Sequence, residues 1–194
     1  MARHLALIAT AALAAVLAVS VAATEIGASD RVGAATQSTL RFDVAENPKK
    51  FVFSKEHVDG QGLPAYGNYF VTQGYLYPEG TLNGNDGVKA DGSPLFPNKV
   101  VGEWTCYGSH VGKGAVTKKG PWVVTTQMFQ LGPKFGKTTI VTSGYEIPNQ
   151  GVNITRAVIG GTGKYATSRG EQHQQLLGFG KTQGVKLRVQ IDVR

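Results

Sequence analysis

Two acidic residues and one arginine stand on faces of predicted β-strands whose other members are apolar or uncharged. Side chains alternate between the two faces of a strand, so Glu103 shares a face with Tyr107, and Glu146 shares one with Ile140. Arg156 has only apolar neighbours on its face, which means that it is either paired inside a cavity or reaches out from a rim. If these faces line one lumen, a carboxylate, a guanidinium and a tyrosine hydroxyl converge. Such groups in a dry pocket can orient a ligand and polarise a carbonyl or alkoxide.

The candidate site follows from this strand parity. The candidate catalytic residues, which would orient a ligand or transfer a proton, are Glu103, Arg156 and His173. The candidates for contact with the ligand are Tyr75, Tyr107 and Glu146. Sequence alone leaves open which faces of the strands turn inward.

Other patterns with possible chemistry carry less weight. In Ile159–Tyr165 (IGGTGKY), Tyr165 follows the Gly-Lys pair where a phosphate-binding loop needs Ser or Thr, so a glycine-rich turn is the better interpretation. Cys106 and His110 share a face but lie roughly 13 Å apart along a strand, which predicts a buried, inert thiol. The histidines are scattered, and we expect neither a metal nor a cofactor.

The elements that must position these residues are short strands separated by Gly, Pro, Asn and Asp. Eight are predicted, at residues 51–55, 66–77, 99–111, 122–131, 137–147, 152–159, 166–177 and 185–193. The last has the cleanest alternation, with one apolar and one polar face. Residues 166–177 are polar on both faces, which fits an edge strand in water or a strand that faces a polar cavity. The spacing predicts an all-β, antiparallel barrel or sandwich.

One long connection, at residues 78–98, is rich in turn formers. Loops of this length are often lids or binding loops, although a solvated loop is the simpler interpretation. Its Asn and Asp residues do not match the calcium-binding loop of an EF-hand, because Gly87 falls at the fifth position.

Composition and charge limit the classes of function. The 194 residues are 41% hydrophobic and contain one cysteine, so the chain can bury a core but has no disulfide scaffold. The net charge is +7, yet the basic residues are dispersed, so we expect no nucleic-acid partner. Residues 1–23 read as a secretory signal peptide, 24–45 as a flexible segment and 46–194 as the barrel domain. We therefore expect a secreted protein, extracellular or periplasmic, without a stable membrane anchor.

The stretch Ala157–Glu171 (AVIGGTGKYATSRGE) resembles a region shared by allene oxide cyclase-like and dirigent-like barrels. The match comprises the turn at Gly160–Tyr165 and the pair Arg169-Gly170 on the next strand. The resemblance implies an eight-stranded antiparallel, calycin-like β-barrel with a largely apolar lumen, assembled as a homodimer or homotrimer. It also implies cofactor-independent chemistry in which the barrel excludes water and restricts the conformers of its ligand.

The leading hypothesis is a secreted barrel that binds a small apolar ligand and guides its cyclisation or stereoselective coupling, as a cofactor-independent cyclase or isomerase. One alternative is a non-catalytic carrier with the logic of a lipocalin. Another is a structural surface protein whose barrel is filled with side chains.

Overall fold

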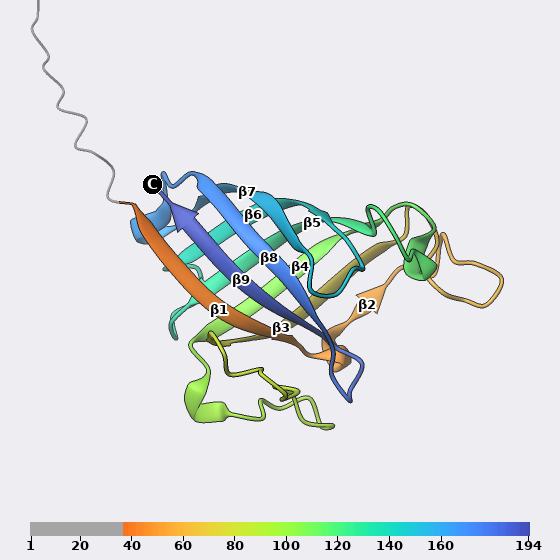
Figure 1. Ribbon diagram of the computed structural model, residues 1–194, viewed down its shortest axis with the longest axis horizontal. Coiled ribbons are helices and arrows are strands. Elements are labelled where there is room, and N and C mark those ends of the chain that lie inside the picture. The colour runs from red at the N-terminus through yellow and green to blue at the C-terminus, as the bar shows by residue number, and fades with distance from the viewer. Residues whose placement is uncertain (1–36) are drawn as a thin grey trace, which may run out of the picture. The chain divides into compact units, whose positions relative to one another are not determined.

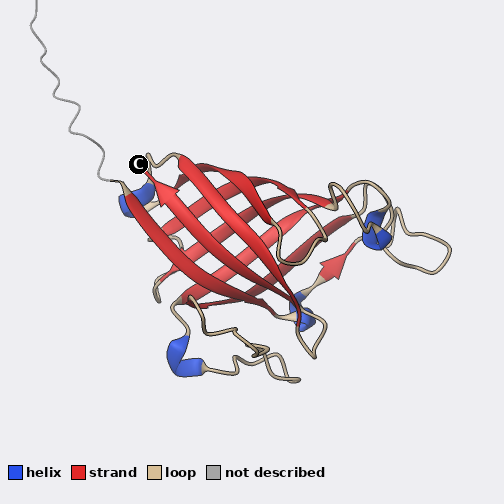
Figure 2. Ribbon diagram, viewed as in Figure 1, coloured by secondary structure: helices blue, strands red, loops and turns tan. Residues whose placement is uncertain are grey.

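Nine strands form one antiparallel sheet, and pairing between β1 and β3 closes eight of them into a barrel (Figure 1). The computed structural model describes residues 37–194. The strands are β1 (Ser38–Glu46), β2 (Val52–Phe53), β3 (Tyr69–Pro78), β4 (Gly102–His110), β5 (Val123–Leu131), β6 (Thr139–Glu146), β7 (Asn153–Gly161), β8 (Gly170–Phe179) and β9 (Val185–Val193). In Figure 2 the described helical segments are short single turns: η1 (Pro48–Lys50), η2 (Pro97–Lys99), η3 (Gly114–Val116) and η4 (Gly163–Tyr165).

The predicted antiparallel β-barrel is confirmed, but the membership of its strands differs from the prediction. The eight segments expected from the sequence correspond to β2–β9, and β2 only extends the edge of β3. The eighth barrel strand is β1, which starts at Ser38, inside the segment expected to precede the barrel. The expected signal peptide at residues 1–23 lies outside the described residues. Within residues 37–194 we find no helix long and apolar enough to cross a membrane.

One end of the barrel is filled by a hydrophobic core. The alternation in β9 turns Leu187, Val189, Ile191 and Val193 inward, as the sequence predicts. They pack against inward residues of the other strands, among them Leu76, Trp104, Phe129 and Ile140. Burying such side chains contributes about 1.5–3 kcal/mol each, so this core is the main stabilising element. At the opposite end, where β1, β4, β6 and β8 finish, the core does not fill the barrel and a cavity remains.

The glycine-rich turn ahead of β8 is confirmed as a structural feature of the core-filled end. Gly163 has a φ of +60° and begins η4, and a Cβ there would meet the carbonyl oxygen of Lys137. The turn places the buried side chain of Tyr165 in the core. Its sequence is therefore set by backbone geometry and packing.

The connection between β3 and β4 covers the outside of the barrel instead of its mouth. Leu82 and Val88 from this connection pack with Ala45 and Tyr77 in a second apolar cluster. The buried carboxylate of Asp43 accepts a hydrogen bond from the Leu82 amide at 2.8 Å and ion-pairs with Arg188. The connection is therefore not a lid, and the simpler interpretation of residues 78–98 as a solvated loop holds only in part, because Leu82 and Val88 are buried against the outer faces of β1 and β3.

Candidate functional site

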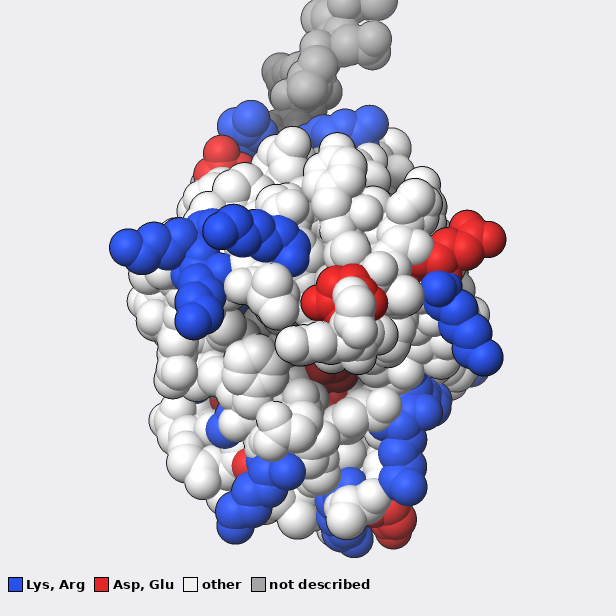
Figure 3. Space-filling view, turned by 90° about the vertical axis from the view of Figure 1, so that its right-hand side faces the viewer, with Lys and Arg blue, Asp and Glu red and all other residues white. Residues whose placement is uncertain are grey.

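A cavity of about 350 Å³ occupies the open end of the barrel. Its size falls within the range of small-molecule pockets, about 300–1,000 Å³. Strands β1 to β6, β8 and β9 and the loops that rim the barrel supply its lining: Glu46, Pro48, Phe51, Phe53, Leu63, Pro64, Phe70, Thr72, Trp104, Cys106, His110, Ala115, Trp122, Val123, Glu146, Phe179, Gln183 and Val185. Figure 3 looks onto this end, where uncharged surface surrounds recessed acidic atoms and Lys and Arg side chains project from the margin.

Aromatic rings in series form one wall of the cavity. The ring of Phe51 lies 6.0 Å from that of Phe53 and stacks on Phe70 at 5.7 Å, centroid to centroid. Phe70 contacts His110 at 5.1 Å, and His110 meets Trp122 edge-on at 6.3 Å. These rings come from β2 and its approach, β3, β4 and the start of β5, so neighbouring strands place them side by side. The result is a continuous, largely apolar surface suited to a flat ligand.

An ion pair between Glu146 and Arg156 lies behind the cavity. Nη1 of Arg156 is 3.4 Å from Oε1 of Glu146, and the arginine side chain is fully buried. The guanidinium also donates to the carbonyl oxygens of Gly144 (3.1 Å), Tyr145 (3.3 Å) and Thr125 (2.9 Å). Because protein acceptors hold the guanidinium, the cavity is lined by the carboxylate of Glu146 and not by Arg156.

A layer of polar side chains inside the barrel donates hydrogen bonds to the Glu146 carboxylate and fixes its position. The Thr125 hydroxyl and the Gln127 amide donate to Oε1 at 2.5 and 3.1 Å, and Gln174 donates to Oε2 at 2.8 Å. Gln172 links the two other glutamines through bonds of 3.0 and 2.8 Å. This layer explains why residues 166–177 are polar on both faces. The edge-strand interpretation is wrong, because β8 lies between β7 and β9 and its inward glutamines complete the network.

Glu46 provides a second carboxyl group in the same cavity. It ends β1, is 8% exposed, and accepts a 2.8 Å hydrogen bond from the Val185 amide. Burial raises the pKa of Glu46, and the nearby charge of Glu146 adds to the shift. Sequence analysis missed this residue because it followed a segment excluded from the barrel, although its place at the end of Phe42–Glu46 gives it the inward parity of Val44.

Burial favours the neutral forms of two further groups in the cavity, His110 and Cys106. Burial lowers the pKa of His110, which favours its uncharged imidazole. Burial also raises the pKa of the Cys106 thiol, which confirms the expectation of a buried cysteine and fits an unreactive one. Within residues 37–194, the ring nitrogens Nε1 of Trp104 and Trp122 and Nδ1 of His110 have no hydrogen-bond partner.

The structure brings two of the six sequence-predicted site residues together, Arg156 and Glu146. Glu103 and Tyr107 lie on the outer face of β4, because Trp104 and Cys106 take the inward positions. The expectation that these two residues line the lumen is wrong. They do share one face of the strand, as predicted, but that face points outward. Tyr75 also points outward, where its hydroxyl donates to the Gly92 carbonyl at 2.9 Å.

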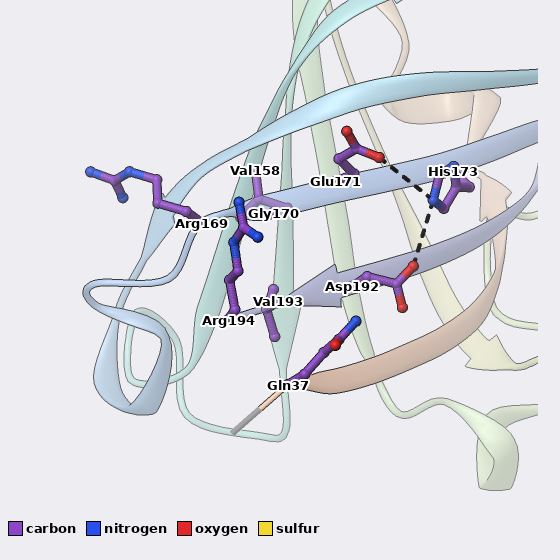
Figure 4. Close-up of a pocket in the computed structure, with 9 residues that line it drawn as sticks. All are labelled: Gln37, Val158, Arg169, Gly170, Glu171, His173, Asp192, Val193 and Arg194. Atoms are coloured by element: carbon purple, nitrogen blue, oxygen red, sulfur yellow. Dashed lines mark ion pairs between the residues drawn. The ribbon is translucent and has the colours of Figure 1, made fainter. Parts of the chain in front are cut away.

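His173 lies in a polar cleft on the outside of the core-filled end (Figure 4). Its Nε2 is 3.5 Å from Asp192 and 4.0 Å from Glu171. Arg169 and Arg194 border the same cleft. His173 therefore does not share a site with Arg156, because it occupies the outward face of β8 while Gln172 and Gln174 face the lumen. Residues 37–194 hold no cluster of three or more His, Cys, Asp or Glu side chains arranged to bind a metal ion.

No protein-family model and no curated protein matches the chain, whereas solved structures do. The pterocarpan synthase dirigent protein PsPTS1 superposes with a TM-score of 0.59 at 15% identity, over 82% of this chain and 95% of that one. The dirigent protein GePTS1 gives 0.57 at 15% identity, over 81% and 83%. A pyocyanin demethylase gives 0.52 at 18% identity, over 81% and 100%.

At these sequence identities the superpositions show that the chain shares the fold of its neighbours, and they do not show that it shares their activity. The resemblance drawn from residues 157–171 is confirmed at this level, since the closed eight-stranded barrel superposes on two dirigent proteins over more than four fifths of this chain. The chain folds as a dirigent-like β-barrel with a cavity at one end.

Proposed function

We propose that the barrel binds a small, largely apolar molecule in the cavity at its open end and guides its cyclisation or stereoselective coupling. The observation that carries this proposal is the pair of carboxyl groups, Glu46 and Glu146, in a cavity otherwise walled by aromatic and aliphatic side chains. The names of the neighbouring structures, two synthases and a demethylase, describe proteins that act on small molecules, and this supports the proposal.

The chemistry would rest on conformational restriction and proton transfer. An aromatic wall holds a flat or folded ligand in few conformations, which lowers the entropy cost of ring closure. Glu146, fixed by Thr125, Gln127 and Gln174, is positioned as proton acceptor. Glu46, whose pKa is raised by burial, is suited to deliver a proton to a second atom of the ligand. One proton leaves the ligand and one arrives, so cyclisation by this route is an isomerisation.

A carrier without catalytic activity is the second candidate, since it needs the same cavity. The filled-barrel alternative is disfavoured by the open volume next to Phe70 and Trp122. Catalyst and carrier differ in what the carboxyl groups do. A catalyst needs Glu146 for turnover, whereas a carrier uses it only for affinity.

The first test is native mass spectrometry of the protein purified from the cells that make it. A retained molecule of a few hundred daltons, released on denaturation, supports the ligand-binding barrel and supplies the substrate for kinetics. The Glu146→Gln variant should then lose turnover by about 10²–10⁴-fold while it still binds. The matched control is Glu103→Gln, an outward residue of β4, which should leave turnover unchanged. A bare protein that also takes up no apolar dye contradicts the proposal, and turnover-free binding identifies a carrier.

We further propose that the chain is secreted, as residues 1–23 suggest, and that it associates with copies of itself. Among the outward-facing residues of β2–β6, Glu103 is the only charged one. That face exposes Val52, Tyr69, Val71, Tyr107, Val124 and Tyr145. Because the chain carries a net charge of +7, this face, which has no Lys or Arg, is where two copies can meet with the least repulsion.

A further inference from the structure

We infer that the cavity selects ligands that carry a positive charge, such as a planar N-alkylated aromatic cation, over neutral and anionic molecules of the same shape. This inference rests on the proposed ligand-binding function and names its substrate class. It follows from the kinds of charge that reach the cavity wall, from the arrangement of the rings, and from the contrast with the rest of the surface.

The charged groups that line the cavity are of one sign. Glu46 and Glu146 are the only Asp, Glu, Lys or Arg residues among the described residues of the lining. Arg156, which pairs with Glu146, is fully buried and is held by Thr125, Gly144 and Tyr145. A ligand therefore meets carboxyl oxygens and not a guanidinium. An anion would have to sit beside the Glu146 carboxylate, and beside Glu46 whenever that group is ionised, with no cation in the lining to pair with.

The aromatic wall adds to this preference. The faces of Phe, Tyr and Trp rings carry the negative end of a quadrupole, so a cation over such a face is attracted by about 0.5–2 kcal/mol. The series from Phe53 to Trp122 lies on β2, β3, β4 and the start of β5. In the closed sheet, β1 and β6 flank β3, β4 and β5, so the two carboxyl groups border this wall on either side. A flat cation stacked on the rings would have a carboxyl group near each edge.

The protonation of Glu46 is compatible with this selection. Glu146, Cys106 and His110 are the other titratable groups that line the cavity with it. Burial favours the neutral form of Glu46 in the empty cavity, and its pKa is raised for that reason. A cation next to the carboxyl group favours the ionised form, so binding draws a proton off Glu46. Cation affinity should therefore increase as the pH rises, whereas the affinity for a neutral ligand should not.

The local preference is opposite to the overall charge. The chain carries a net charge of +7, and a purely surface-driven interaction would favour anions. Lys and Arg side chains gather at the margin of the open end (Figure 3), whereas the lining holds none. Selection for a cation would thus mark the cavity as the binding site, because no other described feature of this basic protein predicts it.

The experiment compares three probes of one shape: 10-methylacridinium, acridine and acridine-9-carboxylate, at slightly alkaline pH, where acridine is neutral. Trp104 and Trp122 both line the cavity and are the chain's two tryptophans, so quenching of their fluorescence reports occupancy. Calorimetry gives the affinities independently. We expect the cation to bind about ten-fold or more tightly than acridine, and the carboxylate to bind least.

The variant Glu46→Gln keeps an acceptor for the Val185 amide and removes the charge. It should lower the affinity for 10-methylacridinium about ten-fold and leave that for acridine unchanged, while Glu103→Gln changes neither. Acridine that quenches both tryptophans and binds as tightly as the cation would overturn the charge selection and leave the proposed function intact. A cation affinity unaffected by Glu46→Gln would overturn it too. Failure of all three probes to bind would contradict the proposed ligand-binding function itself.

Discussion

Arg156 and Glu146, ten residues apart in the chain, meet inside the barrel with Nη1 3.4 Å from Oε1. The arginine side chain is fully buried and that of the glutamate is 12% exposed. The bulk of the pairing energy offsets the cost of taking two charges out of water, so the pair is costly to break from one side. Arg156 on β7 therefore helps to hold the Glu146 carboxylate of β6 in its place at the cavity.

Replacement of Arg156 by methionine should destabilise the protein by about 3–5 kcal/mol, because it leaves Glu146 buried without its partner. Urea denaturation of the variant measures this loss. The double variant Arg156→Met/Glu146→Leu should recover much of it, since both charges are then gone. Arg169→Met, at an exposed position, is the control and should change stability by less than about 0.5 kcal/mol. Equal loss in the single and double variants would mean that packing, not charge, dominates.

The raised pKa of Glu46 predicts a specific pH dependence of stability. Between the ordinary value of 4.5 and the higher folded value, the folded state holds more protons than the unfolded one, so the free energy of unfolding falls as pH rises through this window. Glu46→Gln removes that slope and should be more stable than wild type above the window. Unfolding measured across this pH range in both proteins isolates the effect, because the opposite slope from His110 is common to both. A difference between the two proteins that is independent of pH would contradict the assignment.

The Cys106 thiol should be protected from alkylation in the folded protein. It is 2% exposed, and burial raises its pKa, so little thiolate is present. We expect iodoacetamide to label it about 100-fold more slowly in buffer than in concentrated urea, as followed by intact mass. Fast labelling in buffer would instead reveal a cavity that admits the reagent and a thiol with an ordinary pKa.

Asp43 should control the loop between β3 and β4. Its fully buried carboxylate accepts hydrogen bonds from the Leu82 amide and the Arg188 guanidinium, and the bond from Arg188 to Asp43 holds the pKa of Arg188 above its ordinary value. Asp43→Asn should cost about 1–3 kcal/mol and speed hydrogen exchange in residues 79–100. Glu79→Gln, whose carboxylate lies 3.8 Å from Arg188 at an exposed position, should cost much less. Unchanged exchange in the Asp43 variant would show that the apolar cluster alone holds the loop.

Self-association through the outward face of β2–β6, which has no Lys or Arg, predicts a homodimer or homotrimer that a single positive charge disrupts. Tyr107 is 46% exposed at the centre of that face, between Val71 on β3 and Thr126 on β5. Tyr107→Lys should yield monomers by light scattering, because each interface would bury an unpaired ammonium group. Gln175→Lys, on the outer face of β8, should assemble as wild type does. A wild-type monomer at high concentration would refute the proposal.

The sequence alone determined those features that depend on local pattern. The alternation of Val185–Val193 identified an inward face, and the turn chemistry of Gly160–Tyr165 identified a bend between strands. The isolated charge of Arg156 on an apolar face left two alternatives, a paired arginine inside the barrel or one that reaches out from a rim, and the structure shows the first. The polar run in residues 166–177 likewise left open the polar interior that the structure shows. Each of these signals lies within one strand or one turn.

Tertiary structure alone decided which strand faces turn inward and what covers the outside. Parity relates Glu103 to Tyr107 but is silent on the choice of face, and closure of the barrel turned both outward. β1 does alternate, with Leu40, Phe42 and Val44 on one face, but the assignment of residues 24–45 to a flexible segment left it out of the barrel. Only the structure shows that the loop after β3 buries Asp43 and Ala45 on the outer side of this strand. Glu46 and Glu146 lie 100 positions apart and share a cavity only because β1–β3 pairing closes the sheet. Such contacts depend on strand order, and no periodicity within a single segment encodes it.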